Sequence, residues 1–583
     1  MNKLGRHFLR IGIAAVAAVL VGLAINYLAL PAKTFASGGF WWYVLVELIV
    51  IFAAYGITEM ATYDYDDGKP IGSIITGCLA GVWLIVFIVT AISGSQMVNP
   101  YEYQKIAQVE EGNFEEDIIE ASPEDIVIVD VKTARKLGDR TLGTLKNAAW
   151  YEVDDEYNLV TINGVEYRIS PVNYGGWLKY RKAKHEGIPA YVLVNAMNQE
   201  SAKLVMLDKP MKYSPSAFWS YDLSRHLRNQ YPEYIFAKSF FEVDDSNNPY
   251  WITGVQTPSI GMRGGLLIKS AVITDAVTGD TTEYSIEELP EWVDHAQSVD
   301  FLMDQAEWHF AYTEGFFNFS KTNVYRTSYY YRDQKSESSE DNAANAHTPF
   351  EGYNSVKMKD GTIWFYTGVT PANNAETNVG FLLLNPKTGV MKYYKFIDEN
   401  DDTAGAEESS AQKAAEGLVS NMKYSAAFPT IVNVEGVETY FMTLKDGAGL
   451  VQRYALCNVE NYAKCVCAST LDEVIRLYKI EMGMIDNTEG NNKPEGDTIP
   501  EVDDTREYKE VSGKVTMVEE AQISGYTYYY FMLEGETTIF MSSIENSNMQ
   551  PLKLTEGTNV TIKYYESKEE GIAIVTKIVF DQL

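Results

Sequence analysis

Residues 266–285 read Leu-Leu-Ile-Lys-Ser-Ala-Val-Ile-Thr-Asp-Ala-Val-Thr-Gly-Asp-Thr-Thr-Glu-Tyr-Ser. An apolar segment, Leu266–Thr274, is followed by the turn Asp275–Gly279 and then by a second strand-like segment, Thr281–Ser285. An Asp side chain at the start of a turn can accept hydrogen bonds from the nearby backbone, and glycine supplies the positive φ that closes the turn. This stretch therefore predicts a β-hairpin.

The same order of strand, Asn- or Asp-led turn and strand occurs four times in the chain. The other three turns are Asn195–Asn198, Asn385–Gly389 and Asn458–Asn461. Internal repetition indicates a repeated structural unit. Each hairpin also follows another candidate hairpin, so we expect four-stranded antiparallel meanders. The preceding hairpins lie at Leu159–Ile169, Phe240–Val255, Tyr353–Val369 and Thr430–Leu444.

Helices are expected beside at least two of these units. Ser285 and Glu288 form a capping-box pattern, which predicts a helix leading into Leu289–Asp294 after the second unit. Ser469–Tyr478 takes the same place after the fourth unit. Ser409–Asn421 is typical of a short alanine-containing helix before that unit.

Three apolar runs occupy the first 95 residues: Phe8–Leu30, Phe40–Thr58 and Ile71–Ser93. Each is close to the roughly 20 residues that cross a hydrocarbon core about 30 Å thick. A signal peptide has a shorter apolar region, about 7–15 residues, so we expect an uncleaved anchor of three transmembrane helices. Glu47 lies well inside the second span. It either faces the bundle interior or a partner chain, or lies near the interface and reaches water.

The positions of basic residues predict the orientation of the anchor. The N-terminal tail contains Lys3, Arg6 and Arg10, whereas the first loop contains only Lys33. Lys and Arg are enriched on the cytoplasmic side of membrane proteins. We therefore expect a cytoplasmic N-terminus and a large extracytoplasmic C-terminal body in the cell membrane.

The C-terminal part of the chain has a different pattern. Residues 482–504 lack apolar periodicity and predict an acidic linker. Five strand candidates follow, and their order and lengths resemble an OB-fold, a small barrel that often binds oligomers on the face of its second and third strands. Tyr528 and Tyr530 on the second strand would share a face and could stack against a ligand. Ordinary packing is the alternative. The candidates are Glu510–Val518, Gly525–Leu533, Thr537–Met541, Asn559–Tyr565 and Gly571–Val579.

The predicted fold class is therefore α+β, with transmembrane helices, repeated antiparallel β-meander modules with flanking helices, and a five-stranded OB-like β-barrel. The anchor spans residues 1–95. Two hairpin units lie in 96–300 and two in 301–481. The linker spans 482–504 and the barrel 505–583.

Cysteine and histidine provide no recognisable metal site. Cys78 lies in the third span, and Cys457, Cys465 and Cys467 lie in the fourth unit. A zinc site would need paired C-x-x-C groups or histidines at ligand spacing, and the sequence has neither. We predict no metal, and we expect these cysteines to occupy valine-like positions in a β-region.

Catalytic motifs are also missing from the sequence. It contains no H-E-x-x-H, no G-x-S-x-G, no Walker loop and no G-x-G-x-x-G. Ser410–Lys413 spells the S-x-x-K of penicillin-binding proteins and Lys387–Gly389 spells their K-T-G, but in the wrong order and without S-D-N. A helix cap at Ser409 or Ser410 and a hairpin turn explain both. We predict no catalytic residues and no cofactor.

Two resemblances accompany this pattern. The Asp275–Gly279 and Asn385–Gly389 turns resemble the Asp-x-x-Thr-Gly turn of PepSY-type modules, which are small extracytoplasmic α+β units; the other two turns lack the glycine. Residues 177–294 resemble an uncharacterised family of Gram-positive bacterial multi-span membrane proteins with a large ectodomain. That likeness implies an envelope location and no activity. It rests on Tyr213–Ser216, Asp222–Arg228, Asn248–Trp251 and Pro290–Asp294.

These observations favour a non-enzymatic protein that binds or scaffolds components of the cell envelope. Its expected partners are the lipid bilayer, other envelope proteins or polymers, and a second copy of itself. A net charge of −32 argues against nucleic acid. One alternative is a cell-wall hydrolase whose site is assembled from scattered carboxylates. Another is a subunit of a membrane transport or secretion assembly, with Glu47 at a helix interface.

Overall fold

The structure is a computed structural model. It describes residues 3–62, 70–198, 202–318, 320–321, 323–330, 352–372, 377–396, 404–485, 509–523, 526–536, 538–543, 554–566 and 572–580. The chain forms two compact units, residues 1–487 and residues 488–583, and each is described by itself.

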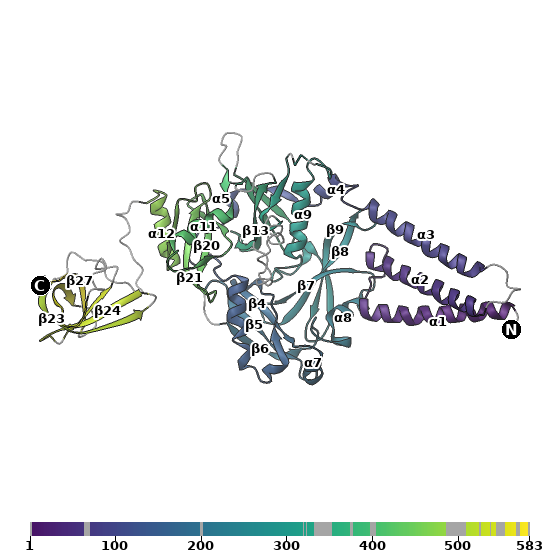
Figure 1. The fold of residues 1–583 in the computed structure, drawn as a ribbon, viewed down its shortest axis with the longest axis horizontal. Helices are drawn as coiled ribbons and strands as arrows, with labels where there is room; N and C mark the ends of the chain where they lie inside the picture. Colours follow the sequence, from purple (N-terminus) through teal and green to yellow (C-terminus); the bar gives the residue numbers. More distant parts are fainter. Residues whose placement is uncertain are drawn as a thin grey trace. The chain divides into compact units, whose positions relative to one another are not determined.

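Three N-terminal helices are long and apolar enough to cross a membrane (Figure 1). They are α1 (Lys3–Ala29), α2 (Gly38–Ala61) and α3 (Ile71–Ser93), and they confirm the three predicted apolar helices. The chain reverses direction between α1 and α2 and again between α2 and α3, so α1 and α3 both end next to the β-rich body.

Polar side chains connect the three helices at the end of the bundle that is remote from the body. The Arg10 guanidinium lies 3.5 Å from Oε1 of Glu59, and its Nε donates to the Thr62 hydroxyl at 2.8 Å. The Ser73 hydroxyl donates to the other carboxylate oxygen of Glu59. Arg10 is 1% exposed and Glu59 5%. Removing one partner of such a pair would leave a buried charge, so the pair fixes how the helices pack.

All four predicted meanders are present as antiparallel sheets of successive strands (Figure 1). The first consists of β3 (Asn158–Ile162), β4 (Val165–Tyr174), β5 (Ile188–Asn195) and β6 (Lys203–Met211). The second consists of β7 (Ile235–Val243), β8 (Pro249–Ile260), β9 (Gly264–Asp275) and β10 (Thr281–Ser285). The third consists of β12 (Asn354–Lys357), β13 (Ile363–Pro371), β15 (Gly380–Leu384) and β16 (Met391–Lys395). The fourth consists of β19 (Thr430–Val434), β20 (Val437–Lys445), β21 (Val451–Asn458) and β22 (Cys465–Ala468).

Short strands extend three of these sheets, and one pair stands apart. β2 (Tyr151–Val153) pairs with β4, β11 (Tyr325–Thr327) with β13, and β18 (Ser425–Ala426) with β20. β14 (Thr377–Asn378) and β17 (Gly405–Ala406) pair with each other.

The side chain that leads each repeated turn holds that turn by the expected mechanism. Oδ1 of Asn195 accepts from the Met197 backbone N–H at 2.8 Å, and Oδ1 of Asp275 accepts from that of Val277 at 2.7 Å. In the third turn, Oδ1 of Asn385 accepts from the backbone N–H of Lys387 at 2.9 Å. In the fourth, Oδ1 of Asn458 accepts from the backbone N–H of Asn461 at 2.8 Å. The turn chemistry read from the sequence therefore determines where each meander reverses.

Two of the three predicted flanking helices are present. They are α11 (Glu408–Leu418), which is capped by Glu407 rather than by Ser409 or Ser410, and α12 (Leu471–Glu481), which is capped by Thr470. The predicted helix over Leu289–Asp294 is wrong. Pro290 disfavours helical backbone at the residue before it, and Leu289 is extended, with ψ 135°. The helix instead begins later, as α9 (Val299–Ala311), which is capped by Ser298.

Other described helices are short. They are α4 (Pro100–Gln104), α5 (Phe114–Asp117), α6 (Val131–Asp139), α7 (Trp177–Ala183) and α8 (Leu223–Gln230), with 3-10 turns at Leu142–Thr144, Ala148–Trp150, Trp219–Tyr221 and Ile286–Glu288.

The segment 109–130, called the strap here, crosses three of the four units. It begins with β1 (Val109–Glu111), which pairs in parallel with β16 of the third unit. Ile118 then bridges to Met358 of the third unit, and Glu120 to Asn433 of the fourth. Near its end, the Ile128 backbone N–H donates to the carbonyl of Ala196 in the first unit at 3.0 Å.

Clusters of buried hydrophobic side chains extend from one unit to another. The largest cluster combines Tyr191 of the first unit with Trp251 of the second and with Phe441 and Leu456 of the fourth. A second cluster joins Phe381 of the third unit to the fourth. Residues 96–300 and 301–481 thus share buried side chains within one compact unit.

The C-terminal unit contains the predicted five-stranded barrel, whose closed order is β23-β24-β25-β27-β26 and fits an OB-like fold. Val515, Phe531, Leu533 and Phe540 are among the residues that fill its core. Most of the predicted linker, from residue 486 onward, lies outside the described residues. The strands are β23 (Lys509–Ile523), β24 (Tyr526–Leu533), β25 (Ile539–Ser543), β26 (Asn559–Glu566) and β27 (Ile572–Phe580).

The cysteines of the fourth unit differ from the sequence expectation. Cys457 and Cys465 are opposite each other on β21 and β22 and form a disulfide, so they are not simple valine-like core residues. The register of the two strands, which the Asn458–Asn461 turn sets, brings the two thiols together. Cys78 and Cys467 are free.

Gly389, which closes the third repeated turn, should tolerate alanine less well than a glycine that has open space. Gly389 has φ +81°, and an added Cβ would lie 2.5 Å from the Gln297 side chain. Gly361 has φ +85° and nothing within 4 Å of an added Cβ. Both Gly→Ala variants should lose about 1–2 kcal/mol because of the left-handed backbone.

Thermal and denaturant unfolding of the purified full chain should therefore show a larger loss for Gly389→Ala than for Gly361→Ala. Equal losses of stability in the two variants would contradict this prediction, because they would mean that the close approach of an added Cβ at position 389 to Gln297 costs nothing.

Candidate functional site at the junction of the modules

The first three β-units meet at the segment 289–298, called the junction loop here. It connects β10 of the second unit to α9. The backbone N–H groups of Ala296 and Gln297 donate to the Pro386 carbonyl in the turn of the third unit at 3.0 and 2.9 Å. This loop is a candidate functional site because it also carries a cluster of buried titratable groups, a feature common to active sites.

Glu242 of β7 is the centre of that cluster and is completely buried. Its Oε1 accepts from the backbone N–H of His295 and lies within hydrogen-bond distance of His295 Nδ1, both at 2.8 Å. Its Oε2 accepts from the backbone N–H of Asp294 at 2.9 Å. The His295 ring stacks on that of Phe240, with 5.6 Å between the ring centroids and 29° between the ring planes. One carboxylate thus holds the junction loop against the second sheet.

Asp294 connects the same loop to the first unit. Its Oδ2 accepts from the backbone N–H of Thr161 in β3 at 2.7 Å. Burial, together with the neighbouring Glu242 carboxylate, raises the pKa of Asp294 well above its ordinary value. The ionised form of Asp294 is therefore disfavoured in the folded protein.

Lys387, the first residue of the K-T-G sequence, belongs to this junction. Its Nζ donates to the Pro290 carbonyl at 2.8 Å, and burial lowers its pKa even though Asp294 and Glu242 act in the opposite direction. The K-T-G residues lie in the turn as predicted. Ser410 and Lys413 lie in α11, and no contact joins either of them to Lys387 in the described part of the chain. The two fragments of the penicillin-binding motif do not form a shared site.

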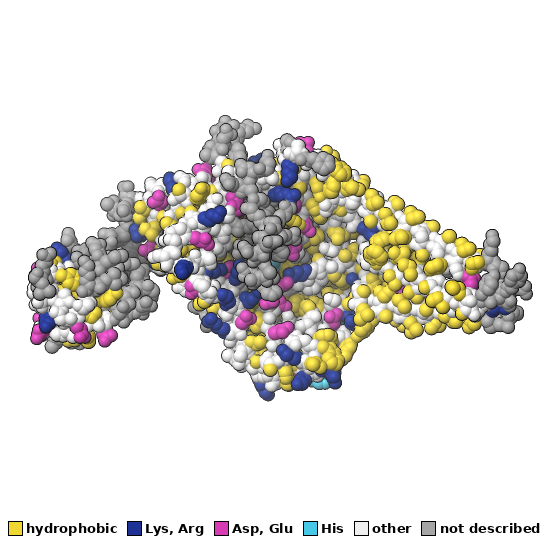
Figure 2. Space-filling model, in the orientation of Figure 1, with side chains coloured by type: hydrophobic (Ala, Val, Ile, Leu, Met, Phe, Trp, Pro, Cys, Tyr) yellow, Lys and Arg dark blue, Asp and Glu magenta, His cyan; other side chains and the backbone are white. Residues whose placement is uncertain are grey.

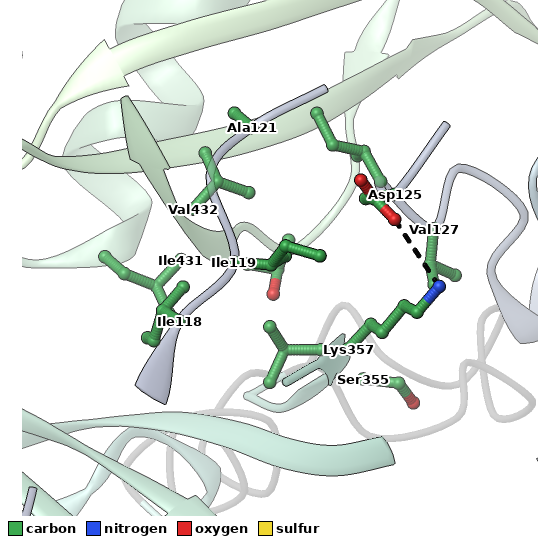
Figure 3. Close-up of a pocket in the computed structure, with 12 residues that line it drawn as sticks. Ile118, Ile119, Ala121, Asp125, Val127, Ser355, Lys357, Ile431 and Val432 are labelled. Atoms are coloured by element: carbon green, nitrogen blue, oxygen red, sulfur yellow. Dashed lines mark hydrogen bonds and ion pairs between the residues drawn. The ribbon is translucent and has the colours of Figure 1, made fainter. Parts of the chain in front are cut away.

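A second charged cluster lies beneath the strap. Nζ of Lys357 on β12 is 2.9 Å from Oε1 of Glu166 on β4 and 3.5 Å from Oδ1 of Asp125 in the strap. Figure 3 shows Lys357 reaching toward Asp125 beside the apolar side chains of Ile118 and Val127. These ion pairs link the strap to the first and third units.

Asp130, at the end of the strap, makes a similar connection to the fourth unit. It forms an ion pair with Lys445 and accepts the capping bond from the Thr133 backbone N–H at 2.9 Å. Burial alone would raise the pKa of Asp130, but the Lys445 ammonium and these hydrogen bonds hold it below its ordinary value. Arg168, also buried, donates to the Val129 carbonyl at 3.0 Å. Charged groups in the body are thus used to bind one unit to another.

The hollows beside the strap are small. The one in Figure 3 has an internal volume of about 20 Å³, and its neighbour, lined by Val129 and Phe441, about 10 Å³. Each has room for about one water molecule. Ligand pockets of enzymes are typically about 300–1,000 Å³, so neither hollow is itself a substrate site.

An exposed patch of aromatic and basic residues lies around α7. Trp177, Leu178 and Trp219 are 42%, 68% and 44% exposed. The Arg181 guanidinium lies 4.9 Å from the ring centroid of Trp177, and Nζ of Lys184 lies 5.7 Å from that of Trp219. Exposed tryptophans beside cations are well suited to contacts with ligands or partner proteins.

Three arginines of the body bind carbonyl groups of the apolar helices α1 and α3 or of Leu30, which follows α1, and this contact was not identified from the sequence. In α8, Arg225 donates to the Tyr27 carbonyl at 2.7 Å, and Arg228 to the Leu30 carbonyl at 3.0 Å. Arg263, at the tip of the β8–β9 hairpin, donates to the Phe87 carbonyl in α3 at 2.7 Å. Its guanidinium also lies 4.5 Å from the Phe87 ring centroid. We call these contacts the arginine seat. The basic residues of segment 222–228 were a signal for Arg225 and Arg228, but the sequence around Arg263 gave none.

Glu47 lies between α1 and α2. A Cβ added to Gly22 of α1 would be 2.6 Å from Oε1 of Glu47, so the carboxylate packs against bare backbone. Oε1 is buried and has no hydrogen-bond partner within the described chain. Asn26 of α1 donates to the Tyr43 hydroxyl one helical turn away at 3.2 Å.

The tyrosines predicted to stack lie on the second strand of the barrel. Tyr530 pairs with Glu519 of β23 and Met541 of β25, and it is half-buried on the face opposite the core residues Phe531 and Leu533. Tyr528 is two residues away on the same strand, and its side chain lies outside the described part.

No protein-family model matches the sequence, and no curated protein matches it. Function is therefore inferred from the geometry of the chain itself.

Replacing Asp294 with asparagine should change how stability depends on pH. Because the folded state raises the pKa of Asp294, the wild type binds more protons folded than unfolded between about pH 4 and that pKa, and its stability falls as pH rises through this window. The asparagine side chain does not titrate, and it retains an oxygen that can accept from Thr161. The variant should therefore gain about 1–2 kcal/mol relative to wild type between pH 4 and pH 8.

Unfolding curves of the full chain at both pH values would measure this gain. Glu287→Gln, at an exposed position near the junction loop, is the matched control and should show no comparable gain. A stability difference between Asp294→Asn and wild type that is constant with pH would contradict the assignment.

Proposed function

We propose that this chain is a membrane-anchored extracytoplasmic protein that binds or scaffolds other components of the cell envelope. The arginine seat is the observation that carries the proposal. Guanidinium groups of the body bind carbonyl oxygens near the ends of α1 and α3. A body held in this way presents its surfaces at a constant height and orientation above the bilayer, as a scaffold requires.

Two features support the extracytoplasmic side for the body. The N-terminal residues Lys3, Arg6 and Arg10 lie at the end of the bundle remote from the body, which corresponds to a cytoplasmic N-terminus. The disulfide between Cys457 and Cys465 is suited to an oxidising compartment.

Binding is favoured over catalysis because the charged clusters connect units to one another. Glu242, Asp294 and Lys387 are all engaged with backbone groups of neighbouring elements. The exposed patch of Trp177 and Trp219 is the surface that we assign to a partner, and the OB-like barrel with Tyr530 is a second module that can carry a ligand.

A subunit of a membrane transport or secretion assembly is the second candidate, and Glu47 favours it. Its buried Oε1 is without a hydrogen-bond partner in the described chain, and a carboxylate inside a bundle commonly pairs with another group. Co-purification of another membrane-spanning chain that depends on Glu47 and is lost in Glu47→Gln would favour this function.

Crosslinking in native membranes, followed by affinity purification of the full chain, tests the binding function. We expect specific envelope components to be captured, and the yield to fall several-fold in Trp177→Ala/Trp219→Ala. Tyr462→Ala, at a residue that is 46% exposed, is the matched control and should leave the yield unchanged. Recovery of the chain alone, without any reproducible partner, would contradict a binding or scaffolding role.

Protease treatment of intact cells tests the orientation. Because the body is expected outside, an added protease should remove an epitope tag placed after Leu583, while a tag before Met1 should remain protected. Membrane vesicles of opposite orientation should give the reverse result. Protection of the C-terminal tag in intact cells, with cleavage in those vesicles, would place the body in the cytoplasm.

A further inference from the structure

The chain leaves α3 into a cluster of exposed apolar residues. Met97 is 48% exposed, Val98 52% and Tyr101 54%. Phe316 and Phe317, from the loop after α9, are 42% and 62% exposed. The rings of Phe316 and Phe317 are in edge contact, with 5.2 Å between their centroids. We call these five residues the apolar ledge.

Contacts between α4 and α9 bring the two parts of the ledge together. The Tyr312 hydroxyl donates to Oε1 of Gln96 at 2.6 Å, and the Tyr312 ring lies 5.8 Å from that of Phe316. Gly315 lies beside Tyr101, whose ring would be in van der Waals contact with a Cβ at that position. The ledge is therefore formed by two segments that are distant in sequence.

Tyr103 fixes the ledge to the end of α3. Its hydroxyl donates to the Gly94 carbonyl at 2.7 Å and accepts from the Gly265 backbone N–H at 3.0 Å. Its ring packs edge-on against Trp308 of α9, with 4.9 Å between centroids. The position of the ledge relative to α3 is thus determined by buried contacts.

The ledge adjoins the membrane-spanning surface. α3 ends at Ser93, and Met97 follows four residues later. Figure 2 shows that the hydrophobic surface of the three helices continues onto the adjoining edge of the body, where α4 lies. Exposed apolar surface of this kind marks an interaction site. Aromatic residues next to the end of a transmembrane helix are typical of the membrane interface.

We propose that the apolar ledge is embedded in the interfacial layer of the leaflet that faces the body, so that lipid is its partner. Continuity with the lipid-facing surface of α3 favours lipid over a protein, and the five residues carry no charge that would select a protein partner. The proposal requires α1–α3 to span a bilayer, and it does not depend on the envelope-binding function. The body is then held to the membrane surface by the ledge as well as by the arginine seat.

Site-directed spin labelling of the full chain in lipid nanodiscs tests this proposal. A nitroxide is attached at Phe317→Cys, or separately at Val98→Cys, in a Cys78→Ala/Cys467→Ala background that shows no labelling by itself. Tyr462→Cys, at a turn of the fourth unit that is 46% exposed, is the matched control. Collision with oxygen and with a water-soluble nickel chelate is measured by electron paramagnetic resonance.

At both ledge positions we expect collision with the nickel chelate to be several-fold lower than at position 462, and collision with oxygen to be higher. Nickel accessibility at 317 and 98 equal to that at 462 would overturn the proposal, because a ledge that faces water or awaits a protein partner would be open to the chelate. Two label positions guard against a local effect of either substitution.

Discussion

The hydrogen bonds from arginines of the body to carbonyl oxygens of α1, α3 and Leu30 determine how the body is held against the three apolar helices. Arg225 and Arg228 reach the end of α1, and Arg263 reaches the last turns of α3. Tyr27 lies in the last turn of α1, where carbonyl groups lack partners within the helix and the helix dipole favours a cation. Leu30 follows that helix, whereas Phe87 lies six residues before the end of α3. Charge-assisted hydrogen bonds of this kind contribute roughly 1.5–3 kcal/mol each. Because α1 and α3 both end next to the body, arginines of the body bind both helices.

Within the body, buried charges connect units that each resemble a simple sheet. Glu242 binds the junction loop, Lys357 of the third unit binds both the strap and the first unit, and Lys445 binds the strap to the fourth unit. A buried carboxylate that loses its partners costs far more than the pair contributes. Such contacts therefore select one arrangement of the four meanders from the many that hydrophobic packing alone would allow.

Sequence patterns predicted the features that depend on local chemistry. Turns led by Asn195, Asp275, Asn385 and Asn458 are stabilised by their own side chains, and the apolar runs and barrel strands follow from composition and alternation. The helix after Glu288 was predicted wrongly because Pro290 outweighs the capping box. The disulfide, the junction and the arginine seat could not be predicted. Glu242 and His295 are 53 residues apart in the sequence and Arg263 and Phe87 are 176 apart, so each pair meets only in the folded chain.

The strap also constrains the order in which the body can be completed. It is synthesised soon after the three apolar helices, yet β1 pairs with β16, and Glu120 pairs with Asn433. These partners are hundreds of residues later in the chain, and long-range pairings of this kind form slowly. The first two meanders can form as they emerge, and residues 128–129 of the strap can then bind the first unit. β1 and Glu120 must remain without their partners until the third and fourth meanders have been made. The pairing of the strap with the third and fourth meanders is thus a late step of biogenesis. A protein truncated before the fourth meander would expose part of the strap to chaperones and proteases.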